Sequence, residues 1–168
     1  MSTDSNTRET TVTWTDPSQG LSLLPTMDGI DFLSKMAAGE IPGPPIGAHM
    51  GMEIAEVGEG TVTFGCQPDE SHYNPIGMVH GGLVCTLLDS VLGCAVHTTL
   101  PKGTGYTSIE IKVNYLRPVS ENSGPLIATG RVTKSGRRVA FAEGEVVDNK
   151  GKTVATASGS LLIFPLET

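Results

Sequence analysis

Long apolar runs and an excess of positive charge are both missing from this 168-residue chain. No apolar stretch approaches the roughly 20 residues that a helix needs to cross a bilayer, and the first ten residues lack the plan of a secretory signal. The 11 lysines and arginines are outnumbered by 18 aspartates and glutamates, which gives a formal charge of −7. This charge disfavours nonspecific binding to nucleic acid or to an anionic membrane. We therefore expect a cytoplasmic protein that acts on a small soluble molecule.

Cysteines are few and scattered. Cys66, Cys85 and Cys94 form no CxxC pair and no ligand cluster with the four histidines. The spacing therefore predicts no metal site, and no cofactor is expected. We interpret the three thiols as small buried hydrophobic groups.

The length fits a single domain. Residues 1–25 are rich in Ser, Thr, Asp and Gln and have few apolar anchors, so they are expected to form a flexible lead-in. Residues 26–168 are expected to form the domain. It begins with a short helix at 28–38, which the prolines of segment 42–45 stop before an irregular connector.

The apolar pattern then changes to a period of two. Segments 50–57 and 61–67 alternate on either side of a glycine-containing turn, which predicts two paired strands. Four more strands are expected at 107–116, 126–134, 139–147 and 154–164, joined by short turns. A long helix at about 81–99 lies between the two groups. The predicted class is α+β, and a helix apolar on all sides requires either a sheet that curls around it or a second subunit.

Asp89 is the one charged residue within segment 83–96, where apolar residues occupy every side of the helical wheel. Such a helix is normally buried. A carboxylate with little water must find partners or raise its pKa, and both outcomes are associated with functional sites. Asp89 is therefore the first candidate catalytic residue.

Gly81 and Gly82 open the same helix. Glycines let a ligand approach the backbone, and the unpaired amides of a first helical turn suit a carbonyl oxygen or an anion. Gly81 and Asp89 are eight residues apart, which is about 12 Å along a helix axis. Reacting atoms must lie within about 3 to 3.5 Å of each other, so the two groups must come from different copies of the helix. This spacing predicts a dimer with two equal sites at its interface.

A signature of polar and glycine residues follows a fixed order along the chain: Asn74, the run His80-Gly81-Gly82, Asp89, and the run Leu116-Arg117-Pro118-Val119. It resembles the hotdog-fold acyl-CoA thioesterases of the phenylacetate-degradation and 4-hydroxybenzoyl-CoA thioesterase type, over about residues 45–165. The resemblance implies a curved antiparallel sheet wrapped around one long central helix, in a dimer or a dimer of dimers. It also implies hydrolysis of an aryl- or medium-chain acyl-CoA thioester to the free acid and CoA.

The resemblance implies a role for each signature residue. Asp89 would be the catalytic carboxylate, and the Gly81 amide would polarise the thioester carbonyl. Asn74 and His80 would position the carbonyl or the attacking water, and Gly82 would contact substrate. Two mechanisms stay open: Asp89 attacks directly and forms a mixed anhydride, or it activates water as a general base.

A hydroxyl on the strand after the helix assists in some relatives. Strict alternation with Ile109 and Ile111 turns Thr107 toward the helix, whereas the family alignment favours Ser108, so both are candidates. Gly93 stands where some aryl-CoA relatives carry a threonine that assists hydrolysis, and their version of that step is not expected here.

Three arginines are candidate contacts for the phosphates and pantetheine amides of CoA. Arg117 matches a family position that contacts CoA, and Arg137 and Arg138 lie at a predicted hairpin turn. Two other functions compete with hydrolysis. A hotdog dehydratase also uses a helix-borne carboxylate, but with a differently placed histidine. A noncatalytic acyl-CoA-binding or sensor module would need an output element, and the lead-in has no helix-turn-helix pattern.

Overall fold

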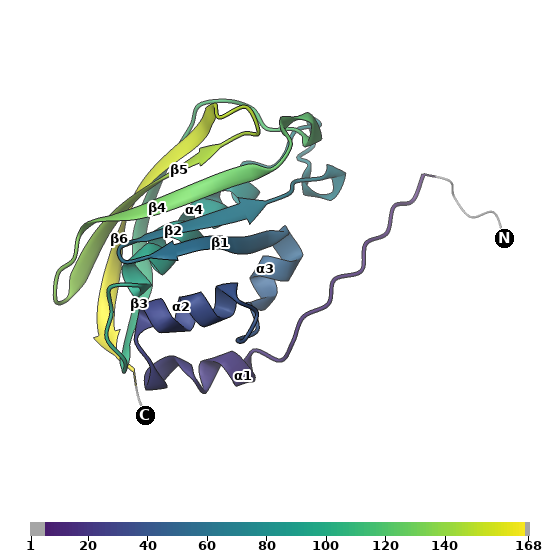
Figure 1. Cartoon of the computed structure of the whole chain (residues 1–168). Helices are drawn as coiled ribbons and strands as arrows, with labels where there is room; N and C mark the ends of the chain where they lie inside the picture. Colours follow the sequence, from purple (N-terminus) through teal and green to yellow (C-terminus); the bar gives the residue numbers. More distant parts are fainter. Residues whose placement is uncertain (1–5, 167–168) are drawn as a thin grey trace.

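The structure is a computed structural model that describes residues 6–166. Six antiparallel strands form one sheet in the order β1-β2-β4-β5-β6-β3, and the sheet curves around the long helix α4 (Figure 1). Residues 1–5 of the expected lead-in and the last two residues of the expected domain lie outside the described residues. The elements are α1 (Ser18–Leu21), η1 (Leu24–Thr26), α2 (Gly29–Ala37), α3 (Pro45–Met50), β1 (Met52–Gly58), β2 (Thr61–Cys66), η2 (Glu70–His72), α4 (Gly81–His97), β3 (Thr104–Tyr115), η3 (Glu121–Ser123), β4 (Leu126–Lys134), β5 (Val139–Val147) and β6 (Thr153–Pro165).

The α+β prediction is confirmed, and each of the six predicted strands is present. Two short α-helices were not predicted. α3 occupies part of the expected irregular connector, with Pro45 in its first turn, where a missing N–H costs nothing. α1 lies inside the lead-in, where its single buried residue, Gly20, gives no periodic apolar signal.

Close approach to the sheet explains how α4 is buried. Three glycines on neighbouring strands face the helix, and a Cβ at each would collide with it. At Gly130 that atom would lie 2.2 Å from the Val91 carbonyl oxygen, and at Gly144 it would lie 2.6 Å from the Leu92 side chain. At Gly159 it would lie 2.8 Å from the same leucine. The glycines therefore let α4 pack directly against the sheet backbone, and the sheet itself curls around the helix.

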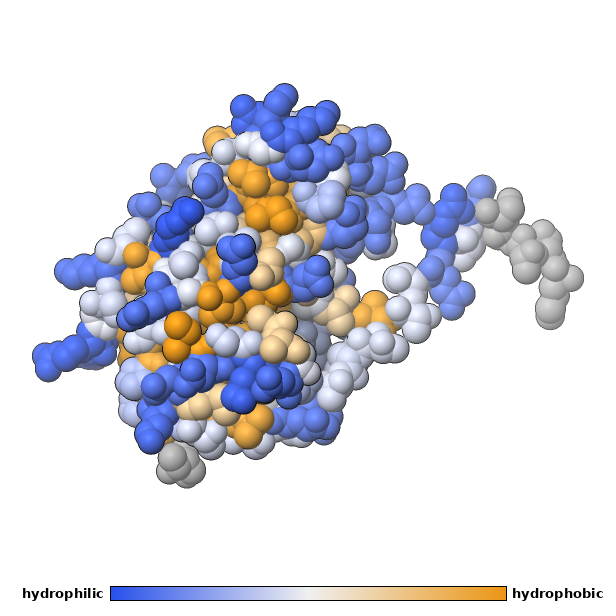
Figure 2. Space-filling model, in the orientation of Figure 1, coloured by the Kyte–Doolittle hydropathy of each residue, from blue (hydrophilic) through white to orange (hydrophobic). Residues whose placement is uncertain are grey.

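One stripe of α4 is left partly open by the sheet. Leu87, Leu88 and Val91 have no exposed surface, whereas the stripe on the other side of the helix is only half-buried. Its members are Cys85, Thr86, Asp89, Ser90 and Cys94. The space-filling view shows apolar side chains reaching the surface near α2 and β1 (Figure 2). The carboxylate predicted to have little water is thus partly exposed in a single chain.

β3 lies at one edge of the sheet and pairs only with β6 among the described strands. Ile109, Tyr115 and Leu116 on and just after this strand are each more than half exposed. An unpaired edge with exposed apolar side chains is a surface that can pair with another chain. It borders the open stripe of α4.

The C-terminal end of α4 carries a buried histidine. The His97 ring lies 5.7 Å from that of Phe32 and 5.5 Å from that of Tyr106, and its side chain makes no ion pair within residues 6–166. Burial lowers the pKa of His97 to about 4. The ring is therefore neutral in the folded protein at pH 7 and packs as part of the core.

His97 makes stability depend on pH. Its folded pKa lies below the roughly 6.5 of an unfolded chain. Between about pH 6.5 and pH 4 the unfolded state is therefore protonated at His97 to a greater extent than the folded state, and the free energy of unfolding decreases as the pH falls. We expect His97 alone to lower the free energy of unfolding by about 2 kcal/mol between pH 7 and pH 5. Urea unfolding at both pH values measures it. His97→Gln is the control, since it should lose about 2 kcal/mol less than wild type. Equal losses in both proteins would contradict the assignment.

Candidate active site

Asp89 and Ser108 meet between the helix and the edge strand. Asp89 projects from the middle of α4, and its Oδ1 accepts a hydrogen bond of 2.7 Å from the Ser108 Oγ on β3. One carboxylate oxygen is thereby oriented, and Oδ2 makes no hydrogen bond within residues 6–166. A carboxylate held in this way can accept a proton from water or attack a carbonyl carbon.

A β-bulge decides which hydroxyl faces the helix. The pairing of β3 with β6 shifts between Ser108 and Glu110, so Ile109 is an extra residue in the strand and is 54% exposed. Alternation therefore breaks at Ile109, and the inward-facing set before it includes Ser108. The expectation that Thr107 faces the helix is wrong, because it assumed a regular strand; Thr107 pairs with Leu162 and is exposed.

A cavity of about 620 Å³ adjoins Asp89. Its walls come from α2, α3, α4, β1, β2, β3, the loop before α3 and the segment before α1, and they are mainly apolar. The apolar side chains include Met36, Ile46, Met52, Ile54, Phe64 and Tyr106. Among the described residues that line it, Asp89 and Glu53 alone are charged. The cavity can therefore hold an apolar group next to the carboxylate.

The N-terminus of α4 lies in a second cavity, of about 340 Å³. Gly81 lines it, and within residues 6–166 the Gly81 N–H has no hydrogen-bond partner, as is usual for the first residue of a helix. The Tyr115 hydroxyl donates to the Gly81 carbonyl at 2.9 Å. A donor with the helix dipole behind it is thus available to a carbonyl oxygen.

His80 caps the helix. Its Nδ1 accepts a 2.8 Å hydrogen bond from the Gly82 N–H, so the neutral ring carries its proton on Nε2 and can still donate. The Gly82 amide is therefore already used and cannot bind a carbonyl as well, which corrects the expected substrate contact through this backbone group. A Cβ on Gly82 would lie 2.8 Å from the same Nδ1, so the cap requires glycine there.

Asn74 organises the loop before α4. Its side-chain oxygen accepts from the backbone amides of Ile76 and Met78, both at 3.1 Å. Its Nδ2 has no hydrogen-bond acceptor within the described range, and Asn74 is one of the residues that line the cavity that holds Gly81. Asn74 can therefore donate to a ligand beside the Gly81 amide.

The structure does not bring all the candidates together in one chain. Asn74, Gly81 and Arg117 line one cavity, whereas Asp89 and Ser108 line the other. Nothing in a single chain shortens the separation of about 12 Å that the helix imposes.

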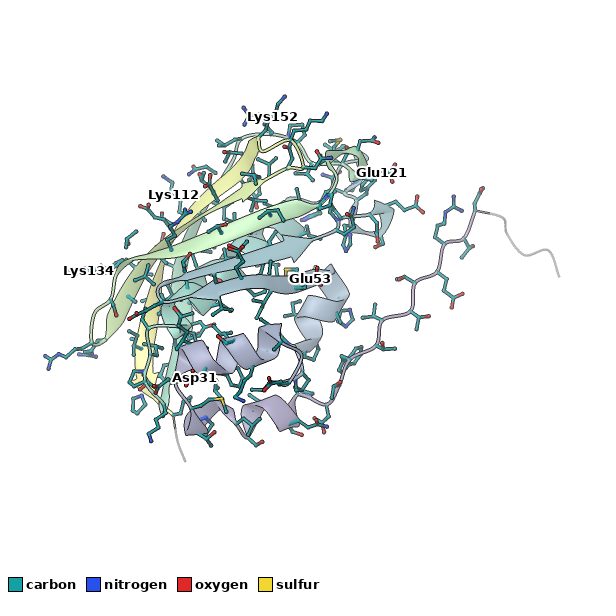
Figure 3. All side chains as sticks on the ribbon, in the orientation of Figure 1. Asp31, Glu53, Lys112, Glu121, Lys134 and Lys152 are labelled. Atoms are coloured by element: carbon teal, nitrogen blue, oxygen red, sulfur yellow. The ribbon has the colours of Figure 1, made fainter. Side chains whose placement is uncertain are left out.

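The candidate arginines also lie at opposite ends of the sheet. Arg117 donates to the Thr153 carbonyl and lines the Gly81 cavity. Val139, next to Arg137 and Arg138, pairs with Leu162, which pairs with Thr107, so this hairpin lies two strands or about 10 Å from the Asp89 end of β3. In Figure 3 Lys134 marks the hairpin end, and Glu121, shortly after Arg117 in the chain, marks the other.

Two other chemistries lack a basis in the described residues. Residues 6–166 contain no group of three His, Cys, Asp or Glu side chains that could hold a metal ion. Burial raises the pKa of Cys94, which lines the Asp89 cavity, to about 11, so its thiol stays protonated at neutral pH and is a poor nucleophile.

No helix within residues 6–166 is long and apolar enough to span a membrane.

Sequence reasoning missed Tyr115 and Trp14, each of which lines one of the two cavities. Tyr115 stands within the predicted strand 107–116 but carries no spacing signal that links it to Gly81. Trp14 lies in a polar segment without periodicity, and only the folded chain places it beside α3.

Comparisons with known proteins agree with this fold. The family model of the thioesterase superfamily matches residues 76–155. A candidate esterase of Halobacterium salinarum is 32% identical over 128 residues, which cover 70% of this chain and 83% of that protein. Acyl-coenzyme A thioesterase 13 of Mus musculus is 31% identical over 52% of this chain and 61% of its own. The solved structure of a phenylacetic acid degradation-related protein from Ralstonia eutropha is 30% identical, with a TM-score of 0.71 over 77% of this chain and 98% of that one.

The fold and the comparisons define a hotdog protein: an antiparallel six-stranded sheet around one long helix. The chain belongs to the thioesterase superfamily, and it is a thioester hydrolase. The resemblance carried by the His-Gly-Gly and Leu-Arg-Pro-Val runs is confirmed.

Proposed function

We propose that this protein hydrolyses an aryl- or medium-chain acyl-CoA thioester to the free acid and CoA, at a site that two chains share. The observation that carries the proposal is the division of the site residues between two cavities. Asp89 and Ser108 adjoin an apolar cavity that suits an acyl group, and the unpaired Gly81 amide lines another. Each chain would supply the carboxylate of one site and the carbonyl-binding amide of the other.

A second copy is the partner that this arrangement requires. The unpaired edge of β3, the exposed Ile109 and the open stripe of α4 lie together on one side of the chain and support contact there. A two-fold axis would place each Gly81 near the other chain's Asp89 and make two equal sites. We propose a homodimer or a dimer of dimers in the cytoplasm. Light scattering should give two or four chain masses, and a monomer with full activity would refute the shared site.

The chemistry follows from where charge develops. As a nucleophile adds to the thioester carbon, negative charge grows on the carbonyl oxygen, and a fixed amide such as that of Gly81 stabilises it. Asn74 Nδ2 and the His80 Nε2 proton would serve the same oxygen or the water. The C–S bond then breaks, and CoA leaves as the thiolate and takes up a proton.

Asp89 can act in two ways, and isotope labelling separates them. As a general base it takes a proton from water, whose oxygen enters the acid product. As a nucleophile it forms a mixed anhydride while CoA leaves as the thiolate, and attack of water on the Asp89 carbonyl carbon then releases the acid and leaves the water oxygen in the regenerated carboxylate. A single turnover in ¹⁸O-labelled water puts the label into the product acid in the first case. Label in Asp89, read by mass spectrometry of the peptide, would establish the second.

The three arginines fit the proposed dimer. Arg137 and Arg138 belong to the Asp89 end of one chain, and Arg117 belongs to the Gly81 end of the other. Across a shared site both groups would lie near one thioester, where guanidinium groups can bind the phosphates of CoA in a bidentate way. Within one chain they cannot do so, because they are at opposite ends of the sheet.

Release of the CoA thiol from a panel of aryl- and alkyl-CoA esters tests the proposal. We expect turnover with benzoyl-, phenylacetyl- or C6 to C12 acyl esters well above the rate without protein. A noncatalytic acyl-CoA-binding module would bind these esters without releasing thiol. A dehydratase would convert a hydroxyacyl thioester to its enoyl form with the thioester intact. Either result would contradict the proposal that this protein hydrolyses CoA esters.

A further inference from the structure

The segment between residues 8 and 17 crosses beside the Asp89 cavity and is attached at both ends. At one end the Arg8 side chain pairs with Glu70 of η2 at 2.9 Å. At the other end α1 packs on the domain, where Gly20 is buried against Ile41. Figure 1 shows the segment as an extended chain that leaves α1 and runs past α3. The exposed ion pair adds little stability by itself, so the packing of α1 contributes most to holding the segment beside the cavity.

Trp14 is the side chain that this segment brings to the cavity. Its ring lies 5.2 Å from the ring of His49 on α3, tilted by 38°, and together with Thr13 and Thr15 it lines the cavity. The indole is nevertheless 55% exposed. A large aromatic group held over an apolar cavity and left half in water gains free energy when an apolar ligand covers it.

The other residues that line the same cavity indicate what kind of ligand it holds. Asp89 and Ser108 lie in the lining together with Trp14, so a thioester carbon held at Asp89 places its acyl group in the space that Trp14 borders. An acetyl group cannot extend through a cavity of about 620 Å³, whereas a medium-chain or aryl group can. The match to the superfamily begins at residue 76, so Trp14 lies outside the matched part.

We propose that Trp14 is a specificity-determining residue that covers the acyl group and selects large apolar acyl chains over short ones. This inference rests on the proposed function. Its experiments therefore separate loss of hydrolysis from loss of selectivity.

Fluorescence gives a direct test, because Trp14 is the only tryptophan in the chain. The Asp89→Asn protein is titrated with octanoyl-CoA and with acetyl-CoA, with excitation that avoids the three tyrosines. We expect a saturable shift of the emission to shorter wavelength with octanoyl-CoA, as the indole leaves water, and a smaller one with acetyl-CoA. Calorimetric binding of octanoyl-CoA without any shift in emission would overturn the proposal. This readout does not depend on turnover.

Kinetics gives the second test. The ratio of kcat/KM for octanoyl-CoA to that for acetyl-CoA should fall about tenfold in Trp14→Ala, while Trp14→Phe keeps most of it. Leu21→Ala is the matched control, since Leu21 is an exposed apolar residue of the same N-terminal region that does not line the cavity. An unchanged ratio in Trp14→Ala would overturn the role of Trp14 and leave hydrolysis intact. Absence of hydrolysis in wild type would instead overturn the proposed function.

Discussion

Replacing Asp89 by asparagine is expected to lower kcat at least about a hundredfold on every thioester that the protein accepts. An amide can neither take a proton from water nor form an anhydride, so both mechanisms open to Asp89 are lost. The substitution keeps the shape of the side chain, and the amide oxygen can still accept the Ser108 hydrogen bond. The fold should therefore survive. Thiol release measured at saturating substrate gives the effect on kcat.

Glu53 provides the matched control for this substitution. It is the other carboxylate that lines the same cavity, but it lies on β1 and is exposed. Glu53→Gln should change kcat less than about threefold, because removal of an exposed charge has small effects. Circular dichroism and thermal unfolding of both variants confirm that each is folded. If Asp89→Asn kept a third or more of the activity, Asp89 would not be the catalytic carboxylate.

Replacing Gly81 by proline is expected to lower kcat by about a hundredfold or more, because proline has no N–H with which to stabilise the carbonyl oxygen. Gly81 is the first residue of α4, where proline is compatible with a helix. The preceding His80 has φ −63° and ψ 134°, the extended conformation that a residue before proline adopts. The change therefore removes one donor with little effect on the backbone.

Gly81→Ala is the control for the added bulk. Both variants place a Cβ about 3.1 Å from the Tyr115 ring, whose end can move, but alanine retains the N–H. We expect alanine to keep activity within about tenfold of wild type. Equal losses in the two variants would show that crowding against Tyr115, and not the amide, causes the effect.

A mixture of the two inactive variants tests the shared site. If Asp89 and Gly81 of one site come from different chains, a mixed dimer of Asp89→Asn with Gly81→Pro contains one intact site and one doubly altered site. Random reassociation makes about half of the dimers mixed, so about a quarter of the wild-type activity should return. Coexpression with two affinity tags isolates the mixed dimer. A site within one chain predicts only the residual activities of the two variants.

The helix and the strands were readable because their signals are local. Segments 126–134 and 139–147 match β4 and β5 at both ends, since period-two alternation and glycine turns bound them. The sequence could not predict which side chains of β3 face the helix. The extra residue at Ile109 exists because β3 pairs with β6 through a bulge, and that pairing joins residues about 50 positions apart. For this reason strict alternation predicted that Thr107 faces the helix, whereas in the structure Ser108 does so.

The sequence by itself determined that one carboxylate stands inside an apolar helix, eight residues from a glycine amide at its start. A helix has a fixed rise per residue, so this spacing alone separates the two groups by about 12 Å and calls for a second chain. Only the tertiary structure decided that Ser108 orients Asp89, that the Gly82 amide is taken by His80, and that Trp14 borders the acyl cavity. The Ser108 and Trp14 contacts join segments far apart in the chain, and the His80 cap depends on how the ring turns back onto the helix, so none of the three leaves a periodic trace in the sequence.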